Sequence, residues 1–446
     1  MQSLFGTDGI RGNVSSPLFS QTSLTKIGYA IGAWTVHHYG HRPTVIIGYD
    51  TRYSAQTIKQ SLIAGLMSLP VDVLDAHIIP TPAAAHLLRL MPHVATAIII
   101  SASHNWAEDN GIKLFDQKHG KLTLVDEQEI TAYYYESSIP AETSRSGSMF
   151  PLTQGSQQYA QHIYTEMRHI TPWVKHKTIH VVLDAAHGAT AHLATQLFEK
   201  LGMRVTTLHN QPDGYNINKL SGSTHPQVLQ EAVIHHKADI GFAFDGDGDR
   251  IIAVNRHGHI KNGDDLLCLL LDHPDYKAAT SVVGTIMTNG GLEYHLAQRN
   301  VSLLRTPVGD RFIMELLNRE QLLLGGEPVG HIILRNHLYT GDGLLVALKV
   351  LETIMITHNW DMVTFTPHAH VTEKMVIQTR HDLSQEPFAS IIHNARKSLP
   401  YGRVIVRYSG TEPVLRIAVE AETISQAQHE SAILINKLQH AFKELS

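Results

Sequence analysis

The feature that most constrains this chain is the repeated order of a short apolar run, a polar turn and an amphipathic stretch. The apolar runs have the length of buried strands, and the stretches after them have the length of helices. This order is typical of α/β units with mostly parallel sheets. Strands are predicted at residues 44–48, 97–100, 180–183, 240–244 and 281–287, and helices at 55–69, 191–201 and 343–356.

The turns after these strands carry most of the polar side chains that could take part in catalysis or ligand binding. They read YDTR, SASHN, DAAHGAT, DGDGDR and TNGGL in chain order. In α/β sheets ligands bind beyond the carboxyl ends of the strands. We therefore expect the functional site to be built from these turns.

The length and the pattern together predict the domain organisation. A chain of 446 residues is long enough for about three domains, with four possible. The strand–turn–helix unit recurs in three successive blocks, whereas the tail reads as strands at 371–380 and 402–410 and a helix at 425–445. We predict three α/β domains and a smaller C-terminal α+β domain, at residues 1–150, 151–253, 254–367 and 368–446.

Charge and hydropathy argue against several classes of protein. The net charge is −5 with neutral histidines, which is unlike the basic footprint of a nucleic-acid-binding protein. No apolar run approaches the ~20 residues of a membrane helix, and the N-terminus lacks the features of a signal peptide. The single cysteine, Cys268, lies in an apolar run, so we expect it to be buried and without an internal disulfide. These observations predict a soluble, cytoplasmic protein that binds neither nucleic acid nor membranes.

The strongest local motif is the acidic turn DGDGDR at residues 245–250. Asp245, Asp247 and Asp249 alternate with glycines, so three carboxylates can converge on one hard cation. An EF-hand would need glycine and glutamate where Arg250 and Arg256 stand, so that interpretation fails. Three carboxylates leave coordination positions open, which suits Mg²⁺ shared with a substrate phosphate. The alternative is a solvated acidic turn.

Other motifs are weaker when each is taken alone. Ser103 follows a strand and is a candidate nucleophile or phosphate carrier, although a serine in a loop is usually a turn residue. The segment around Arg407 combines a guanidinium, hydroxyls and a glycine that can surround a phosphate, or it is a polar turn. Glu327 and His331 lie in a Gly-rich segment and could bind and deprotonate a sugar hydroxyl. Arg11 could hold a phosphate or cap a turn.

Taken together and in this order, the motifs resemble the α-D-phosphohexomutase superfamily, and within it most closely the bacterial phosphoglucosamine mutases. The resemblance rests on FGTDGIRG at 5–12, SASHN with the following DNGIK, DGDGDR, GGE-x-x-GH at 325–331 and R-x-SGTEP at 407–413. The connecting segments GYNIN, VGDR and TGDG are also similar. The resemblance covers the whole chain and implies three related α/β domains with mixed sheets, plus a smaller C-terminal α+β domain, around a central cleft.

The resemblance also implies a reaction. Phosphorylated Ser103 would donate its phosphoryl group to glucosamine 6-phosphate, and the 1,6-bisphosphate would reorient and return its other phosphate, leaving glucosamine 1-phosphate for UDP-N-acetylglucosamine synthesis. The implied cofactors are Mg²⁺ and glucose or glucosamine 1,6-bisphosphate as activator or intermediate. The partner is a phosphosugar, and the chain would be a monomer or homodimer.

The same resemblance implies a role for each site residue. An oxygen of phosphorylated Ser103 and the side chains of Asp245, Asp247 and Asp249 would ligate Mg²⁺. Arg11 and Arg250 would neutralise charge, and Lys113 and His331 would exchange protons with sugar hydroxyls. The residues that would bind substrate are Glu327 on the ring, and Arg407, Ser409, Gly410 and Thr411 on the phosphate that is not being transferred.

The sequence departs from the family pattern at three positions. Trp106 stands where the family has proline, Val329 where it has serine, and Tyr408 where a basic residue is common. Trp106 puts the geometry of the Ser103 loop in question, and Val329 removes a hydroxyl from the Gly-rich segment 325–331, which by the resemblance would bind the sugar. The alternatives that remain are a phosphomannomutase/phosphoglucomutase and a catalytically weakened relative that only binds phosphosugars.

Overall fold

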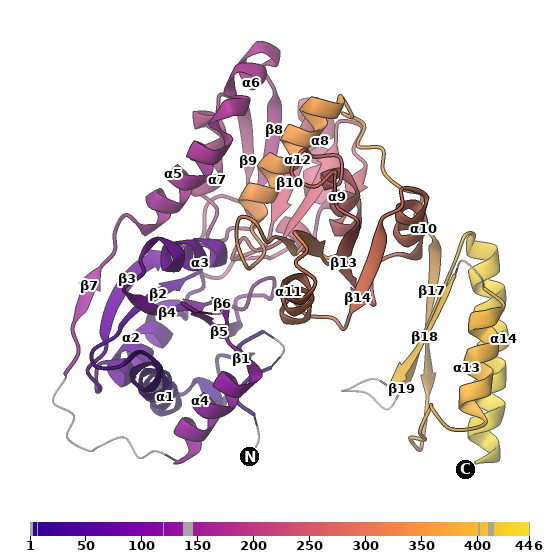
Figure 1. The fold of residues 1–446 in the computed structure, drawn as a ribbon, viewed down its shortest axis with the longest axis horizontal. Coiled ribbons are helices and arrows are strands. Elements are labelled where there is room, and N and C mark those ends of the chain that lie inside the picture. The colour runs from indigo at the N-terminus through magenta and orange to yellow at the C-terminus, as the bar shows by residue number, and fades with distance from the viewer. Residues whose placement is uncertain are drawn as a thin grey trace. The chain divides into compact units, whose positions relative to one another are not determined.

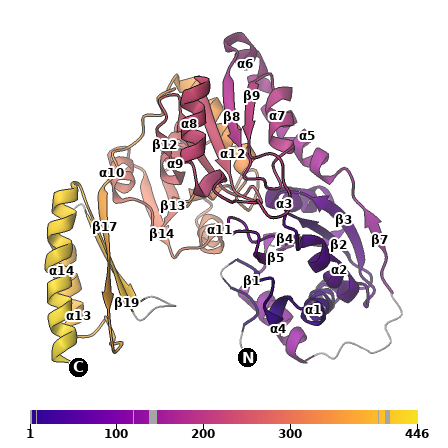
Figure 2. The same cartoon turned by 180° about the vertical axis from the view of Figure 1, so that it is seen from behind.

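The computed structural model describes residues 3–6, 8–118, 120–136, 146–399, 402–408 and 414–445. Its contacts divide the chain into two compact units. The larger unit contains the chain up to residue 287 together with 304–363, and the smaller contains 288–303 together with the chain from 364 onward. Figures 1 and 2 show the elements from opposite sides.

The first sheet of the larger unit is built around two strands with buried side chains on both faces, β2 (Thr44–Tyr49) and β4 (Val94–Ile100). The strand order is β1-β5-β4-β2-β3-β7, with β6 paired to β5. Strand β2 pairs in parallel with β3 and β4, whereas β5 runs antiparallel to both β4 and β1. The other strands are β1 (Ile10–Asn13), β3 (Asp72–Ile78), β5 (Asp109–Asp116), β6 (Gly120–Lys121) and β7 (Met149–Pro151).

The helices of this domain include one pair in very close contact. A Cβ on Gly28 would lie 2.2 Å from the Leu62 carbonyl oxygen, and a Cβ on Gly65 would lie 2.0 Å from that of Thr25. Only glycine allows the backbones of these two helices to approach so closely. The pair is α1 (Gln21–Tyr39) and α2 (Ala55–Leu66), and the other helices are η1 (Pro17–Phe19), α3 (Thr81–Leu90) and α4 (Leu124–Glu136).

The second sheet has the order β12-β11-β10-β8-β9. Strands β8 and β10 are fully buried and parallel, and β11 pairs antiparallel with β10. The strands are β8 (His180–Asp184), β9 (Arg204–Leu208), β10 (Ile240–Phe244), β11 (Ile251–Asn255) and β12 (Ile260–Lys261). The helices are α5 (Gly155–Met167), η2 (Arg168–Ile170), α6 (Thr171–Lys177), α7 (Leu193–Lys200), η3 (Gly222–Thr224) and α8 (Gln227–His236).

A third sheet has the order β14-β13-β15-β16. Helix α9 begins with a capping box, in which Asn262 accepts from the Asp265 amide and Asp265 accepts from the Asn262 amide. Cys268 lies in α9 and is buried, as predicted. The elements are α9 (Gly263–Leu270), β13 (Ser281–Thr285), β14 (Ser302–Thr306), α11 (Asp310–Arg319), β15 (Leu324–Gly326), β16 (Ile332–Leu334) and α12 (Gly343–Thr357).

The smaller unit is an antiparallel three-stranded sheet, ordered β17-β19-β18, with helices packed on it. Helices α13 and α14 lie along the sheet (Figure 1), and Phe388, Leu415 and Leu434 belong to their shared core. The elements are α10 (Gly290–Gln298), β17 (Ala369–Val376), α13 (Phe388–Lys397), β18 (Arg403–Tyr408), β19 (Val414–Ala421) and α14 (Ile424–Glu444).

The predicted α/β class with mixed sheets and a small C-terminal α+β domain is confirmed, and the errors lie at the ends of elements. Helix α2 stops at Leu66 rather than at 69, because Pro70 disfavours helical backbone in the residue before it. Strand β13 stops at Thr285 rather than at 287, since the Thr285 hydroxyl accepts a bond from the Met287 amide and turns the chain. Among the described residues, no helix is both long and apolar enough to cross a membrane.

The contact between α3 and α5 buries an imidazole that titrates far from its usual range. The ring of His86 lies 4.0 Å from that of His162 and 6.0 Å from that of Tyr159, measured between centroids. Burial, assisted by the nearby His162 and Arg89, lowers the pKa of His86 to about 3. In the unfolded chain the same group titrates near its ordinary value of 6.5.

We predict that His86 makes the protein less stable in mild acid. Because the pKa of His86 is depressed in the folded state, its contribution to the free energy of unfolding is complete above pH 6.5. As the pH falls toward 3, the unfolded chain binds the proton first and this contribution is lost, by about 2 kcal/mol at pH 5. His86→Gln should therefore lose less unfolding free energy between pH 7 and pH 5 than the wild type, in urea titrations at both pH values. The exposed His192 offers the control, since His192→Gln should keep the wild-type difference. Equal pH dependence in His86→Gln would contradict the prediction.

Candidate active site

Two polar loops meet where β4 and β10 end. Ser103, in the loop after β4, donates a hydrogen bond from Oγ to Oδ2 of Asp245 at 2.6 Å. Asp245 opens the loop after β10, and both side chains are almost completely buried. The fold thus joins the predicted phosphate carrier to the first predicted metal ligand, although 142 positions separate them in the sequence.

The DGDGDR turn at residues 245–250, called the acidic loop below, brings its three carboxylates close together. Oxygen atoms of Asp245, Asp247 and Asp249 lie within 4.8 Å of one another, and all three residues are buried. The Oδ1 atoms of Asp247 and Asp249 are buried without a hydrogen-bond partner among the described residues. Oxygen-only ligands with unpaired lone pairs fit Mg²⁺, which prefers such donors. The DGDGDR turn is therefore buried, not the solvated acidic turn that the sequence left as an alternative.

The glycines of this loop are needed for close approach and for a tight turn. A Cβ on Gly246 would lie 2.7 Å from the carbonyl oxygen of Ser103, so any side chain there would push the two loops apart. Gly248 has a φ of +73°, in the left-handed region that favours glycine. The alternation of aspartate and glycine thus serves both ligand placement and backbone geometry.

Lys113 supplies the positive charge that balances the acidic loop. It lies on β5, and its Nζ donates to Oδ2 of both Asp247 and Asp249 at 2.8 Å. Burial acts to lower the pKa of Lys113, but the attraction of these two carboxylates outweighs it and raises the pKa well above its usual value. Burial and the neighbouring carboxylates of Asp249 and Asp247 raise the pKa of Asp245 well above its usual value.

His331, which directly precedes β16, reaches the same centre from the third sheet. His331 Nδ1 lies 3.5 Å from Asp249 Oδ1, while its Nε2 accepts a bond from the Gly341 amide at 3.1 Å. Gly330 has a φ of +90°, and a Cβ there would lie 1.9 Å from the Ile251 carbonyl oxygen. A residue other than glycine would therefore separate this loop from β11.

Glu327 and Arg250 lie on the same side of the site. Glu327 Oε1 accepts a bond from the Gly309 amide at 3.1 Å. Arg250 Nε lies 4.0 Å from Asp245 Oδ2 and 3.9 Å from Asp249 Oδ1. Val329, one of the departures from the family pattern, has 49% of its surface exposed, so it does not pack into the protein core.

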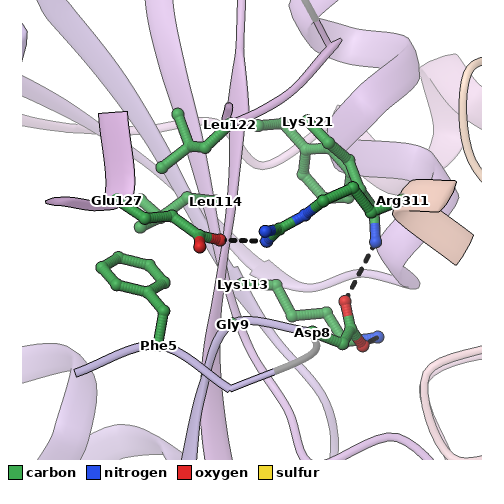
Figure 3. A pocket seen from close by; sticks show the side chains of 10 residues that line it. Phe5, Asp8, Gly9, Lys113, Leu114, Lys121, Leu122, Glu127 and Arg311 are labelled. Carbon is green, nitrogen blue, oxygen red and sulfur yellow. Dashed lines mark hydrogen bonds and ion pairs between the residues drawn. The ribbon is translucent and has the colours of Figure 1, made fainter. Parts of the chain in front are cut away.

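A small pocket beside Lys113 collects further charges (Figure 3). Asp8 pairs with Arg11 Nη2 at 2.6 Å, with Lys121 Nζ at 3.0 Å and with Lys113 Nζ at 3.3 Å. Arg11 also reaches the Ala102 carbonyl oxygen at 3.5 Å, next to Ser103. The guanidinium of Arg11 is partly exposed, so it can meet an anion at this edge of the site.

The Ser103 loop contains features for which the sequence suggested no role. His104 Nδ1 lies 3.4 Å from Ser103 Oγ, and burial, followed by the charge of Arg250, lowers the pKa of His104 to about 4. Trp106 has 55% of its surface exposed, while its backbone carbonyl accepts a bond from Arg52. The replacement of proline by Trp106 therefore leaves the backbone of the loop anchored.

The predicted phosphate-binding segment belongs to the smaller unit. Arg407 is exposed on β18, where it stands opposite Arg416 of β19. Tyr408 donates a bond from its hydroxyl to the His381 carbonyl oxygen at 2.6 Å. Ser409, Gly410 and Thr411 lie outside the described residues.

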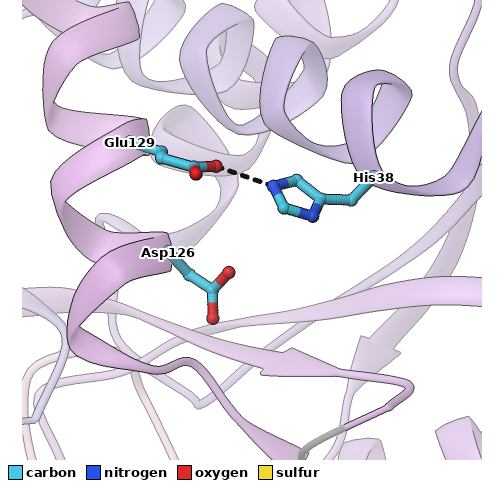
Figure 4. A group of neighbouring side chains, drawn as sticks. All are labelled: His38, Asp126 and Glu129. Atoms are coloured by element: carbon cyan, nitrogen blue, oxygen red, sulfur yellow. Dashed lines mark hydrogen bonds and ion pairs between the residues drawn. The ribbon is translucent and has the colours of Figure 1, made fainter.

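A second group of possible metal ligands lies between α1 and α4 (Figure 4). His38 Nε2 lies 2.7 Å from Glu129 Oε2, and both side chains are partly exposed. Asp126 Oδ2 accepts bonds from the amide and hydroxyl of Thr123. These contacts are those of a surface pair and a helix N-terminus, whereas the carboxylates of Asp245, Asp247 and Asp249 are all buried.

Comparison with known proteins agrees with this architecture. Four domain families named phosphoglucomutase/phosphomannomutase match in order: domain I at residues 2–139, domain II at 157–258, domain III at 262–363 and the C-terminal domain at 371–436. The chain therefore belongs to the phosphoglucomutase/phosphomannomutase family of α-D-phosphohexomutases. It is, by the same comparisons, an enzyme of the isomerase class.

Full-length relatives make the relationship more specific. The chain is 36% identical to a phosphoglucosamine mutase of Neisseria subflava, over 95% of this chain and 96% of that protein. It is 35% identical to a phosphoglucosamine mutase of Acinetobacter baumannii, over 97% of this chain and 98% of the relative.

Solved structures show the same fold at lower identity. A phosphoglucomutase/phosphomannomutase family protein of Burkholderia thailandensis superposes with a TM-score of 0.78 at 22% identity, over 99% and 98% of the two chains. An N-acetylphosphoglucosamine mutase of Aspergillus fumigatus, solved with GlcNAc-6P and magnesium, gives a TM-score of 0.65 at 16% identity, over 98% of this chain and 96% of that one.

We predict that Asp247 is required for binding of a divalent cation. Asp247→Asn removes one of few charged ligands, so the affinity for Mn²⁺, used as a spectroscopic probe for Mg²⁺, should fall at least about 10-fold. Electron paramagnetic resonance titration of free Mn²⁺ measures this affinity. Asp361→Asn, which changes an exposed aspartate, should bind Mn²⁺ like the wild type. Unchanged Mn²⁺ affinity in Asp247→Asn would contradict the prediction that this loop binds the cation.

Proposed function

We propose that this chain is a magnesium-dependent phosphoglucosamine mutase that interconverts glucosamine 6-phosphate and glucosamine 1-phosphate through phosphorylated Ser103. The observation that supports it most strongly is the 2.6 Å contact of Ser103 Oγ with Asp245 inside a buried carboxylate triad. A serine beside a cation site is suited to carry a phosphoryl group, since phosphoryl transfer depends on positioning and charge stabilisation. The full-length matches to curated phosphoglucosamine mutases support the choice of sugar.

The proposed reaction moves a phosphoryl group without net loss of phosphate. A sugar hydroxyl oxygen attacks the phosphorus on Ser103, the bond from phosphorus to Oγ breaks, and the hydroxyl proton passes to a protein base. The resulting 1,6-bisphosphate reorients, Ser103 Oγ attacks the phosphorus at the other position, and the released sugar oxygen recovers a proton. One phosphoryl group leaves the enzyme and one returns, so Ser103 ends phosphorylated.

The residues around Ser103 divide the remaining tasks. A Mg²⁺ held by Asp245, Asp247, Asp249 and a phosphoserine oxygen would withdraw charge from the phosphoryl group. Lys113 and His331 are proposed to exchange protons with the sugar hydroxyls, since both touch the acidic loop.

Further residues would bind the substrate. Arg11 and Arg250 would balance the negative charge of the phosphates, and Glu327 would accept bonds from ring hydroxyls. Arg407, with Ser409, Gly410 and Thr411, would hold the phosphate that is not transferred. The product would feed UDP-N-acetylglucosamine synthesis, and glucose 1,6-bisphosphate or its glucosamine analogue would prime Ser103.

Two other functions remain as alternatives, and a comparison of turnover with different phosphosugars distinguishes them. A phosphomannomutase/phosphoglucomutase would prefer mannose or glucose phosphates, and a non-catalytic sensor would bind phosphosugars without turning them over. Ser103 and Lys113 both contact the buried carboxylates, and these contacts support an enzyme over a sensor.

We predict that Ser103→Ala abolishes mutase activity while the protein stays folded. The wild type should carry a phosphate ester visible by intact mass and should turn over glucosamine 6-phosphate with a higher kcat/KM than glucose or mannose 6-phosphate. Ser103→Ala should lack both the ester and the activity in a coupled assay. Ser101→Ala removes a backbone contact of the loop but keeps the carrier, so it should retain the ester.

Two results would contradict this proposal. Substantial turnover by Ser103→Ala would exclude Ser103 as the carrier. A higher kcat/KM for mannose or glucose 6-phosphate would support the sister activity instead.

We further predict that Val329 limits the rate. Valine cannot hydrogen-bond a sugar hydroxyl brought against it, and an unsatisfied polar group costs about 1–3 kcal/mol, or roughly 5–150-fold in kcat/KM. Val329→Ser should therefore raise kcat/KM for glucosamine 6-phosphate without changing the Mg²⁺ dependence. Val228→Ser, at another exposed valine, should have no effect. No gain from serine at 329 would show that this side chain does not face the sugar.

A further inference from the structure

The backbone carbonyls of the Ser103 loop converge on one buried arginine. Arg52, from the YDTR turn after β2, donates from Nη2 to the carbonyl oxygens of Ser103 at 2.9 Å and Asn105 at 2.8 Å. Its Nη1 donates to those of Trp106 and of Asp109, the latter at 2.9 Å. The fifth donor, Nε, meets Asp50 Oδ2 at 2.9 Å, so every N–H of the guanidinium is used.

Asp50 links this arginine to the amide of the carrier serine. The side chains of Asp50 and Arg52 are completely buried. Asp50 Oδ2 also accepts a bond from Ser101 Oγ at 2.6 Å, and Ser101 Oγ accepts from the Ser103 amide at 2.9 Å. Both the amide and the carbonyl of Ser103 are therefore tied to one buried ion pair.

Asn218 binds the same two carbonyls from the second domain. It ends the GYNIN segment, and its Nδ2 donates to the Ser103 carbonyl oxygen at 2.8 Å and to that of Asn105 at 2.9 Å. A Cβ on Gly246 of the acidic loop would lie 2.7 Å from this Nδ2. Asn218 thus lies against both the Ser103 loop and the acidic loop, although its hydrogen bonds go to backbone carbonyls and not to Ser103 Oγ.

The backbone of Ser103 needs such support. Its φ is +54°, a left-handed conformation that is uncommon for a residue with a side chain. A conformation of this kind persists only where surrounding contacts over-determine it. Without them the loop would relax, and Ser103 Oγ would move away from Asp245.

We propose that Arg52 and Asn218 are positioning residues that clamp the Ser103 loop from two sides and hold Ser103 Oγ at the acidic loop. The inference rests on the proposed role of Ser103 as phosphoryl carrier. Displacement of a reacting group by about 1 Å can cost on the order of 100-fold in rate. Loss of the clamp should therefore lower kcat while the KM for the phosphosugar stays nearly constant, because no substrate contact is removed.

Asn218→Asp tests the clamp with almost no change of shape. It replaces the donating amide by an oxygen that faces two carbonyls, and aspartate also tolerates left-handed backbone, as found at position 218. We expect kcat to fall about 10- to 100-fold and KM to change less than about 3-fold. The matched control is Asn216→Asp, which lies in the same segment but donates to the Gln211 carbonyl oxygen instead. It should keep wild-type kcat, because the bond that it loses does not involve the Ser103 loop.

Arg52→Lys and Asn218→Gly provide independent variants. Lysine keeps the charge but has at most three donors for five acceptors, so kcat should again fall with little change in KM. Glycine keeps the left-handed backbone at 218 without the donors, and should reproduce the kcat loss of Asn218→Asp. If Arg52→Lys does not fold, the two Asn218 variants decide alone.

The outcomes separate this inference from the proposed function. A kcat within about 2-fold of wild type in Asn218→Asp, or an equal loss in Asn216→Asp, overturns the clamp. A loss expressed mainly in KM also overturns it. Turnover by Ser103→Ala would instead overturn the carrier role itself, whatever the clamp variants do.

Discussion

The structure depends on the burial of several negative charges at one point. Asp245, Asp247 and Asp249 are almost completely shielded from water, and charges without partners are very costly to bury. Lys113 neutralises part of this charge from a strand of another sheet, and His331 approaches from a third. The site therefore combines side chains from all three of these sheets.

Close approach of backbones makes this convergence possible. Gly246 passes against the Ser103 carbonyl, Gly188 against Gly246, and Gly341 against the Asp249 carbonyl, each at a distance that a Cβ would not allow. Most of these loops follow strands whose apolar side chains fix their ends. The acidic loop, the Ser103 loop and the segment 325–331 thus lie in close contact, and groups held in place in this way would need little rearrangement during a reaction.

Much of the fold and the centre of the site could be predicted from the sequence. Strands such as β2 and β10 are short apolar runs ended by polar turns, and their chemistry-bearing residues follow directly. The ends of α2 and β13 were missed because they depend on Pro70 and on a side-chain bond of Thr285, which an apolar pattern does not register. Arg52 and Asn218 could be seen as motif residues, but their partners are backbone carbonyls, which carry no sequence signal.

The sequence by itself determined the α/β class, the acidic loop and the candidate carrier Ser103, because local order of apolar and polar residues dictates strands, turns and their contents. Only the tertiary structure decided that Lys113 faces Asp247 and Asp249, that Ser103 meets Asp245, and that both Nη groups of Arg52 donate to backbone carbonyls within residues 103–109. These contacts join residues far apart in the chain. Their energies depend on burial and on distances between loops, which arise only when the sheets pack together.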